Sequence, residues 1–282
     1  MTTRLKAACC AACLVLGSAA RAQSDPEQKL PLWEIGVGGV ALSTPSYPGA
    51  GQHETRVLVF PNIVYRGRVL RADRSGIAAR LFRSDRVELD VGFAGALPSD
   101  SDDVDERQGM PDLGPLAEFG PRLKVKLADF GDHRSLRAEL PLRAVIEARG
   151  GLHHRGTTFE PRLTYEIAGP QGLWSLEAMG SVVLGDRKIN RHFYEVAPQF
   201  ATSARPAYAA DAGLVLSRLG LFGTRRVNQD LRVFGYLRYE SYRGTANRAS
   251  PLHVKDSGVS GGVGVLWTFK RSAARARGGE SL

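Results

Sequence analysis

The chain has 282 residues, a formal net charge of +9 and a hydrophobic content of 43%. This length allows one large all-β domain or two ordinary domains, but no Pro- or Ser-rich linker divides the chain. The basic residues are spread along the sequence and no nucleic-acid-reading motif accompanies them, so no nucleic-acid partner is expected. After residue 22 no apolar window is long enough for a spanning helix, and a membrane-embedded chain of this kind must be a β-barrel.

The N-terminus has the three parts of a secretion signal. Arg4 and Lys6 precede an apolar run over residues 7–20, which is too short to cross a bilayer. Small residues two positions apart then predict cleavage between Ala22 and Gln23. We expect a signal peptide over residues 1–22, with an uncleaved anchor helix as the alternative. The mature chain would lack all three cysteines, which are Cys9, Cys10 and Cys13.

The following segments alternate apolar with small or polar residues, a period of two that is typical of strands with two different environments. The alternation is clearest near the C-terminus, where Val259, Val263 and Val265 are separated by small residues. Strands are predicted, in chain order, over residues 33–42, 55–65, 69–73, 77–82, 87–97, 115–127, 135–147, 158–167, 173–184, 209–219, 231–243 and 259–269.

These strands predict an all-β fold, a single closed antiparallel transmembrane β-barrel of about 12 strands that occupies residues 23–269. The connections alternate between long and short, which is typical of outer-membrane barrels with long loops outside and short turns in the periplasm. With a periplasmic N-terminus, the expected outer connections are residues 43–54, 98–112, 148–156, 185–208 and 244–257.

Several strands carry charged residues on one face and large apolar residues on the other. A charge that faces lipid near the bilayer midplane costs about 2–4 kcal/mol, so the charged faces are predicted to line the lumen. Acids and bases are mixed there, which favours cross-strand ion pairs in a narrow interior over a selectivity filter of one sign. The candidate lumen-lining residues are Glu118, Arg122, Arg137, Glu139, Arg143, Glu160, Arg162 and Glu166.

Six short blocks resemble the signature of the MipA/OmpV family of outer-membrane barrels, in the same order, from about Trp33 to Phe269. The blocks are Trp33-Glu34, Ser46-Tyr47-Pro48-Gly49, Tyr65-Arg66-Gly67, residues 81–86, residues 97–103 and residues 109–113. The resemblance implies a Gram-negative outer-membrane location, contact with membrane lipids, and no cofactor. The best-known member joins a lytic transglycosylase to a penicillin-binding protein in cell-wall synthesis, and other members are described as porin-like.

On this resemblance, we expect a non-enzymatic scaffold for murein enzymes, with a narrow porin-like channel for small solutes as the alternative. A scaffold must present its contact surface to the periplasm. The candidate periplasmic partner rim consists of Arg66, Arg68, Arg83, Arg86, Arg225 and Arg226. Residues 270–282 are expected to form a disordered basic tail at the same end. These charges could equally serve topology or contact lipid headgroups.

No enzyme motif is present in its structural context: the chain lacks His-Glu-x-x-His, and its Gly-x-Ser-x-Gly match at residues 258–262 overlaps a predicted strand, not the strand-to-helix turn of a nucleophile elbow. His153 and His154 are expected in an outer loop, where neighbouring histidines are usually solvated. An acidic block within residues 99–105 offers oxygen ligands that calcium takes, but lacks the glycine and closing glutamate of an EF-hand loop. Ion pairs with a base such as Arg107, or capping of the loop, are the preferred explanation, and no metal site is predicted.

Overall fold

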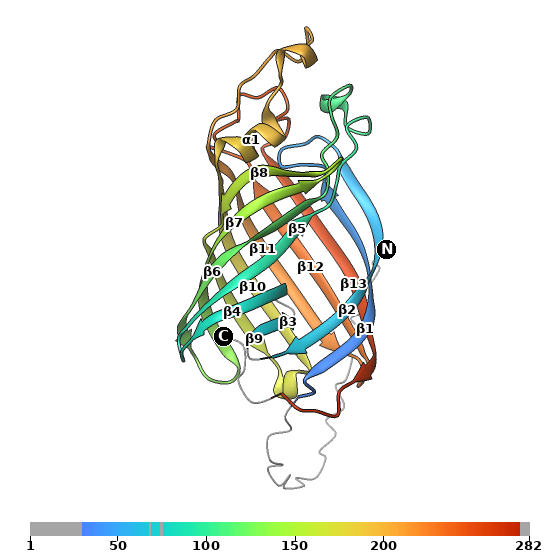
Figure 1. Cartoon of the computed structure of the whole chain (residues 1–282), viewed down its shortest axis with the longest axis vertical. Coiled ribbons are helices and arrows are strands. Elements are labelled where there is room, and N and C mark those ends of the chain that lie inside the picture. Colours follow the sequence, from blue (N-terminus) through green and yellow to red (C-terminus); the bar gives the residue numbers. More distant parts are fainter. Residues whose placement is uncertain (1–29, 68, 74–75, 277–282) are drawn as a thin grey trace, which may run out of the picture.

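The computed structural model describes residues 30–67, 69–73 and 76–276, which form one antiparallel sheet with a short helix, α1 (Arg187–Tyr194) (Figure 1). The predicted signal peptide, its cleavage site at Ala22 and Gln23, and Arg68 lie outside these residues. The strands are β1 (Trp33–Pro45), β2 (His53–Arg66), β3 (Leu70–Asp73), β4 (Gly76–Arg83), β5 (Val87–Ala96), β6 (Leu116–Asp129), β7 (Arg134–Ala148), β8 (Leu152–Phe159), β9 (Arg162–Ala168), β10 (Trp174–Gly185), β11 (Gly213–Arg226), β12 (Leu231–Ser241) and β13 (Ser257–Arg271).

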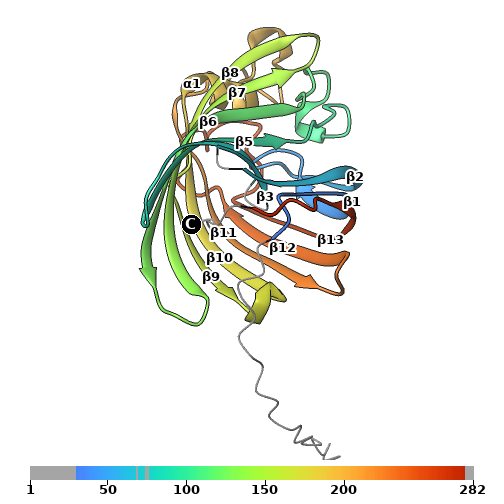
Figure 2. The same ribbon diagram turned by 60° about the horizontal axis from the view of Figure 1, so that its bottom comes forward.

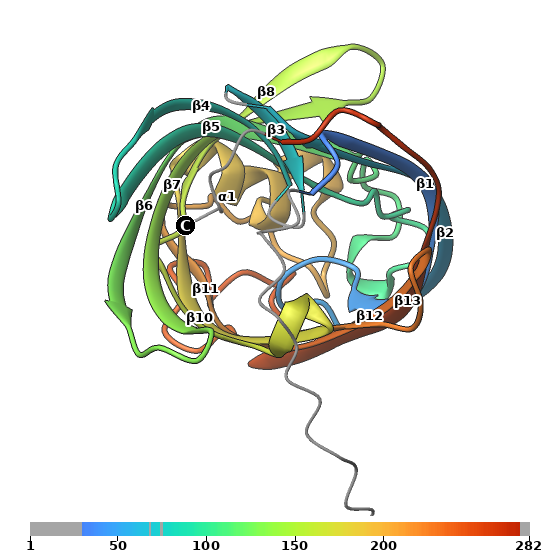
Figure 3. The same cartoon turned by 90° about the horizontal axis from the view of Figure 1, so that it is seen from below.

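The sheet closes into a barrel because β1 pairs with β2 on one side and with β13 on the other (Figure 3). β8 and β9 both lie between β7 and β10, so they are two halves of one strand interrupted at Glu160 and Pro161. Proline cannot donate a ladder hydrogen bond, which explains the interruption. Counted in this way, the barrel has 12 strands, and the predicted fold class is confirmed.

The structure corrects three predicted boundaries. Residues 148–156 were expected to be an outer connection, but β8 begins at Leu152, after a tight turn in which Gly150 and Gly151 adopt φ values of 61° and 135°. His153 and His154 therefore lie in β8 and pair with β7, so their placement in a loop is wrong. β11 continues to Arg226, beyond the predicted end at residue 219.

The third correction concerns the C-terminal segment. β13 ends at Arg271, and the backbone N–H of Ala276 donates to the Leu30 carbonyl at 2.9 Å. The Leu32 N–H donates in turn to the Ala274 carbonyl at 2.9 Å. Disorder was predicted from residue 270 because basic and small residues follow Phe269. For residues 270–276 this prediction is wrong, since they pair with the segment that leads into β1; residues 277–282 lie outside the described residues.

The barrel wall has the opposite polarity to a soluble protein. Outward-facing apolar side chains are exposed, such as Val57 at 77% and Val263 at 68%, whereas inward-facing Asp90 is 1% exposed. In the described ranges, no helix is long and apolar enough to cross a membrane. An outward apolar belt around a polar interior is the arrangement of a barrel in lipid.

The long connections gather at one end of the barrel and pack against one another (Figure 1). We call this assembly the outer cap; it consists of residues 46–52, 97–115, 186–212 and 242–256. Among the described residues, it contains most of the apolar side chains that are fully buried, with Val104, Tyr194, Tyr242 and Leu252 each 0% exposed. The end opposite the cap has short turns and both ends of the described chain.

Hydrogen bonds join the loops of the outer cap. The Tyr47 hydroxyl donates to the Leu252 carbonyl at 2.6 Å, and the Ser250 hydroxyl donates to the Tyr194 carbonyl at 2.7 Å. The Arg107 guanidinium is 4% exposed and lies 5.7 Å from the centre of the Tyr47 ring. Burial lowers the pKa of Arg107 and raises that of Tyr47. The cap is thus a small packed core that covers the outer mouth.

The strand register predicts at which positions an introduced charge prevents assembly of the barrel. Leu140 and Leu163 face outward, and their neighbours Glu139 and Arg162 face the lumen. Leu140→Arg or Leu163→Arg should block assembly in vesicles, because a cation facing lipid costs about 2–4 kcal/mol. Arg162→Ala should still assemble. The fraction of folded barrel, followed by heat-modifiable gel mobility, measures this; equal assembly of both classes would show that the assigned register is wrong.

The cap should loosen in acid. Burial lowers the pKa of His192 to about 4, and its Nε2 atom is buried without a hydrogen-bond partner among the described residues. A histidine in the unfolded cap titrates near 6.5, so cap stability is complete above that pH and falls as the pH drops from about 6.5 towards 4. Near-UV circular dichroism of the cap tyrosines should follow this loss, and His192→Gln should weaken the pH dependence. An unchanged profile in that variant would exclude His192 as the cause, leaving His253, whose pKa burial also lowers.

Candidate functional site

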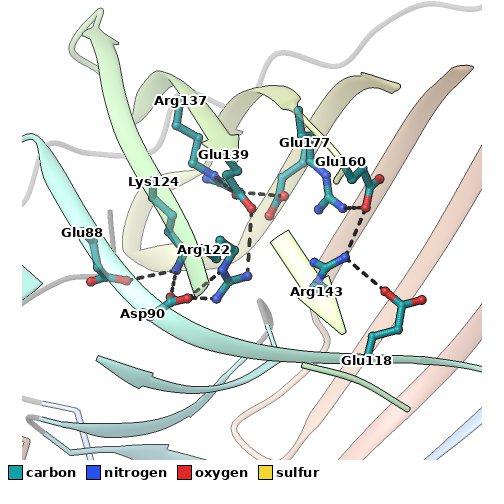
Figure 4. Close-up of polar contacts among 11 residues, drawn as sticks. Glu88, Asp90, Glu118, Arg122, Lys124, Arg137, Glu139, Arg143, Glu160 and Glu177 are labelled. Atoms are coloured by element: carbon teal, nitrogen blue, oxygen red, sulfur yellow. Dashed lines mark hydrogen bonds and ion pairs between the residues drawn. The ribbon is translucent and has the colours of Figure 1, made fainter. Parts of the chain in front are cut away.

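The inward face of one half of the barrel carries a dense set of ion pairs (Figure 4). We call this face the charged wall. Its side chains come from β4 to β12, and most are nearly inaccessible: Glu88 is 2% exposed, Lys124 4% and Arg122 5%. The charged wall consists of Arg80, Glu88, Asp90, Glu118, Arg122, Lys124, Arg137, Glu139, Arg143, Glu160, Arg162, Glu166, Glu177, Arg218 and Glu240.

Cross-strand pairing creates the first group of these contacts. Asp90 on β5 stands directly opposite Arg122 on β6, and the guanidinium binds both carboxylate oxygens, with Nε–Oδ1 at 3.0 Å and Nη2–Oδ2 at 2.8 Å. Lys124 lies 3.0 Å from Glu88 and 3.1 Å from Asp90. Two-oxygen contact fixes the guanidinium in one orientation, so this part of the wall is rigid.

One base and one acid, Arg137 and Glu160, each bind three partners of the opposite charge. Arg137 donates to Glu139 at 3.0 Å, to Glu166 at 2.7 Å and to Glu177 at 3.1 Å. Near the interruption between β8 and β9, Glu160 accepts contacts from Arg143 at 3.3 Å, Arg162 at 3.0 Å and Arg218 at 3.0 Å. Each multiply bonded group is neutralised by several partners, so little unbalanced charge of one sign remains on the charged wall.

The eight candidate lumen residues named from the sequence all lie on this wall, and the structure joins them through the contacts above. Glu88, Asp90, Lys124 and Glu177 belong to the same faces and could have been chosen by the same alternation. Arg218 and Glu240 were missed because the strands that carry them are rich in aromatic and small residues. Arg218 was an isolated charge on a face with Gly220 and Phe222, whereas Glu240 shared its face with Arg232 and Arg238, a signal that the alternation did contain.

The opposite side of the lumen is mainly apolar, although Arg56 and Asn62 of β2 also face inward there, as does Arg238 of β12, which lies 5.3 Å from the centre of the Tyr236 ring. We call this face the apolar wall; it consists of Val40, Leu42, Leu58, Phe60, Phe234, Tyr236 and Leu266. Glycines on neighbouring strands make room for the rings: a Cβ atom at Gly38 would lie 2.5 Å from the Phe60 ring, and one at Gly264 would lie 2.4 Å from the Phe234 ring. The lumen therefore has two chemically different sides.

The described arginines of the predicted periplasmic rim lie at the end opposite the outer cap. Arg66 ends β2 and pairs with Glu34 at 2.6 Å, which offsets part of its charge. Arg226 donates to the Gln171 carbonyl at 3.4 Å, and Arg86 and Arg225 are exposed. Arg83 ends β4 at the same end. The topology thus brings these positions to one rim.

The acidic block forms part of the outer cap. The Asp102 N–H donates to the Asp100 carboxylate at 3.1 Å, as in a loop that caps itself. Arg107 turns away from these carboxylates and donates to the Pro111 carbonyl at 2.9 Å. Across the described ranges, no three His, Cys, Asp or Glu side chains gather closely enough to hold a metal ion.

A closed barrel with apolar side chains outside and charges inside defines the class of this protein: it is a transmembrane β-barrel of the Gram-negative outer membrane. Its sequence matches the family described as MltA-interacting protein MipA over residues 37–269. The chain therefore belongs to the MipA family. No curated protein sequence matches it.

Solved structures with a similar outline are outer-membrane proteins of low sequence identity. The NanC porin is 10% identical, with 83% of this chain and 100% of that chain covered and a TM-score of 0.40. Outer membrane phospholipase A from Escherichia coli is 14% identical, with 88% and 94% covered and a TM-score of 0.36. The COG4313 outer membrane channel from Pseudomonas putida F1 is 12% identical, with 88% and 100% covered and a TM-score of 0.36.

The buried pair of Asp90 and Arg122 should behave as a coupled unit. Asp90→Ala leaves a buried guanidinium without its main acceptor and should lower the free energy of unfolding by about 3 kcal/mol. The double variant Asp90→Ala, Arg122→Met should lose less unfolding free energy than the sum of the two single variants. Each single variant leaves one buried charge without its partner, whereas the double variant removes both charges. Urea unfolding in vesicles gives all three values. Additive losses would mean that the pair is hydrated and weak.

Proposed function

We propose that this protein is a non-enzymatic scaffold that holds murein-cleaving and murein-synthesising enzymes at the inner face of the outer membrane. The observation that carries the proposal is the difference between the two ends of the barrel. The outer mouth is covered by a packed cap, whereas the opposite end presents short turns with exposed Arg86 and Arg225. Such a rim can attract an acidic enzyme surface.

Two further observations support a scaffold. The family description names an interaction with MltA. The family resemblance described above implies that this partner is a lytic transglycosylase. The charges of the lumen are used for pairing with one another, and a wall of paired charges favours a rigid support over a conducting pore. The partner classes we propose are a lytic transglycosylase and a penicillin-binding protein.

Reversing charge at one end of the barrel tests the proposal. Arg225→Glu together with Arg226→Glu should weaken capture of a purified lytic transglycosylase or penicillin-binding protein about tenfold, which equals about 1.4 kcal/mol. The matched control is Arg187→Glu together with Arg243→Glu in the outer cap, where both side chains are exposed. This control should leave capture unchanged. Both pairs should fold equally well, as judged by heat-modifiable gel mobility.

Capture that is unchanged by the rim variant, or weakened only by the cap variant, would contradict the scaffold proposal. The alternative function, a narrow channel for small solutes, makes a separate prediction. Stable single-channel steps from the refolded protein in a planar bilayer, with no capture of either enzyme, would favour the channel.

A further inference from the structure

One part of the barrel wall lacks strand pairing. β2 runs the full height of the barrel, but its pairing with β3 is limited to Tyr65 and Arg66. β5 pairs with β4 only as far as Gly92. Above the β3–β4 hairpin, no strand among the described residues lies between β2 residues 55–63 and β5 residues 93–97. We call this region the β2–β5 seam; in Figure 1 strands of the far wall are visible between β2 and β5, and Figure 2 shows the same strands with the bottom of the barrel turned forward.

Side-chain exposure marks the seam independently. Inward residues in the lower part of β5 are buried, with Glu88 at 2% and Asp90 at 1%. Ala94 and Ala96 continue the same inward face, yet both are exposed, as is outward Phe93 at 50%. The alternation between buried and exposed residues thus ends where β4 ends. At its outer end the seam is bridged by Arg56 of β2, which donates to the Pro98 carbonyl at 2.5 Å.

The seam lies at the depth of the lipid-facing belt. Val57 pairs in register with Ala41 of β1, and Ala41 pairs in turn with Val263 of β13, which is 68% exposed. Val59 and Val265 are likewise the two register partners of Gly39 on β1. Backbone groups at membrane depth without strand partners are tolerated only where they are buried in protein or line a hydrated cavity. The unpaired edge of β2 therefore has to communicate with the lumen behind it.

Pro61 disfavours closure of the seam by another strand. The Arg66 N–H donates towards β1, to the Leu32 carbonyl, and successive residues of a strand point in opposite directions. By this alternation residue 61 would direct its N–H into the seam, but proline has none. A proline on a free edge blocks strand addition. The seam is thus suited to a ligand that needs no backbone hydrogen bonds.

The lumen behind the seam has the chemistry of an acyl-chain site. Leu58 and Phe60 of β2 face inward beside the seam and continue into the apolar wall through Val40, Leu266 and Phe234. These side chains, apart from Val40, are only half-buried. On the outer face beside the seam, Val57, Val59 and Phe93 are exposed at 77%, 77% and 50%. Apolar surface is therefore continuous from the membrane, through the wall, to one side of the lumen.

We propose that the β2–β5 seam is a lateral portal through which an acyl chain of a membrane phospholipid enters the lumen and lies against the apolar wall. This proposal is independent of the scaffold function, since it concerns the wall and not the periplasmic rim. No cysteine follows Cys13 in the sequence, so single-cysteine variants of the mature barrel carry one label. Bimane on such a cysteine, in vesicles of phosphatidylcholine with a nitroxide on the acyl chain, reports contact with that chain.

Bimane at Leu58→Cys should be quenched at least half as strongly as at the outward control Val59→Cys. The matched inward control is Met179→Cys on β10, which pairs with buried Thr164 of β9 and lies away from the apolar wall, so it should be quenched only weakly. Filling the seam from inside with Ala94→Phe and Ala96→Phe should reduce quenching at Leu58→Cys to the level of Met179→Cys. Circular dichroism and heat-modifiable mobility establish that each variant is a folded barrel.

Three results would overturn the portal. Weak quenching at Leu58→Cys would show that acyl chains stay outside. Quenching that persists in the Ala94→Phe, Ala96→Phe variant, or that is equally strong at Met179→Cys, would show entry by another route. Oxidation of Val59→Cys to a disulfide dimer, with weak quenching at Leu58→Cys, would show that the edge of a second copy of the chain occupies the seam.

Discussion

Backbone hydrogen bonding in hydrocarbon is the constraint on which this structure depends. Lipid offers no partner for a free N–H or carbonyl, so a sheet in a membrane must close on itself. Closure occurs where β1 meets β13, and the segment beyond β13 pairs with the residues that precede β1. The same constraint explains the interruption at Pro161, because neighbouring strands maintain the ladder on both sides of a residue that cannot donate.

Closure decides where charge can go. A side chain on a closed barrel faces either lipid or the lumen, so the acids and bases of β4 to β12 are concentrated in a narrow space. They avoid large desolvation costs by binding one another, as Arg137 does with Glu139, Glu166 and Glu177. On the other side, glycines leave space for the rings of Phe60 and Phe234 to pack against the barrel wall. The two sides stabilise the same barrel by different means.

The period of two predicted the fold, the strand faces and the position of most charged-wall residues, because lipid enforces the alternation along each strand. It failed where local geometry overrides the pattern. The pattern places Gly150 and Gly151 within a loop, but their positive φ angles make a tight turn. The outer cap could not be predicted either. Contacts such as that between Tyr47 and Leu252 join segments 205 residues apart, and no periodicity records such a separation.

The outer cap, the ion pairs of the charged wall and the seam together determine where a molecule could enter the lumen. A packed cap covers the outer mouth, and the charged wall is saturated by its own contacts, so neither gives a solute an obvious binding step. The unpaired edge of β2 is the exception to the closure that governs the rest of the wall, and such an edge destabilises a membrane sheet. Arg56 and the β3–β4 hairpin hold its two ends, which confines the exception to the level of the apolar wall. An exposed edge bounded in this way is better explained by passage of an apolar group than by a defect in folding.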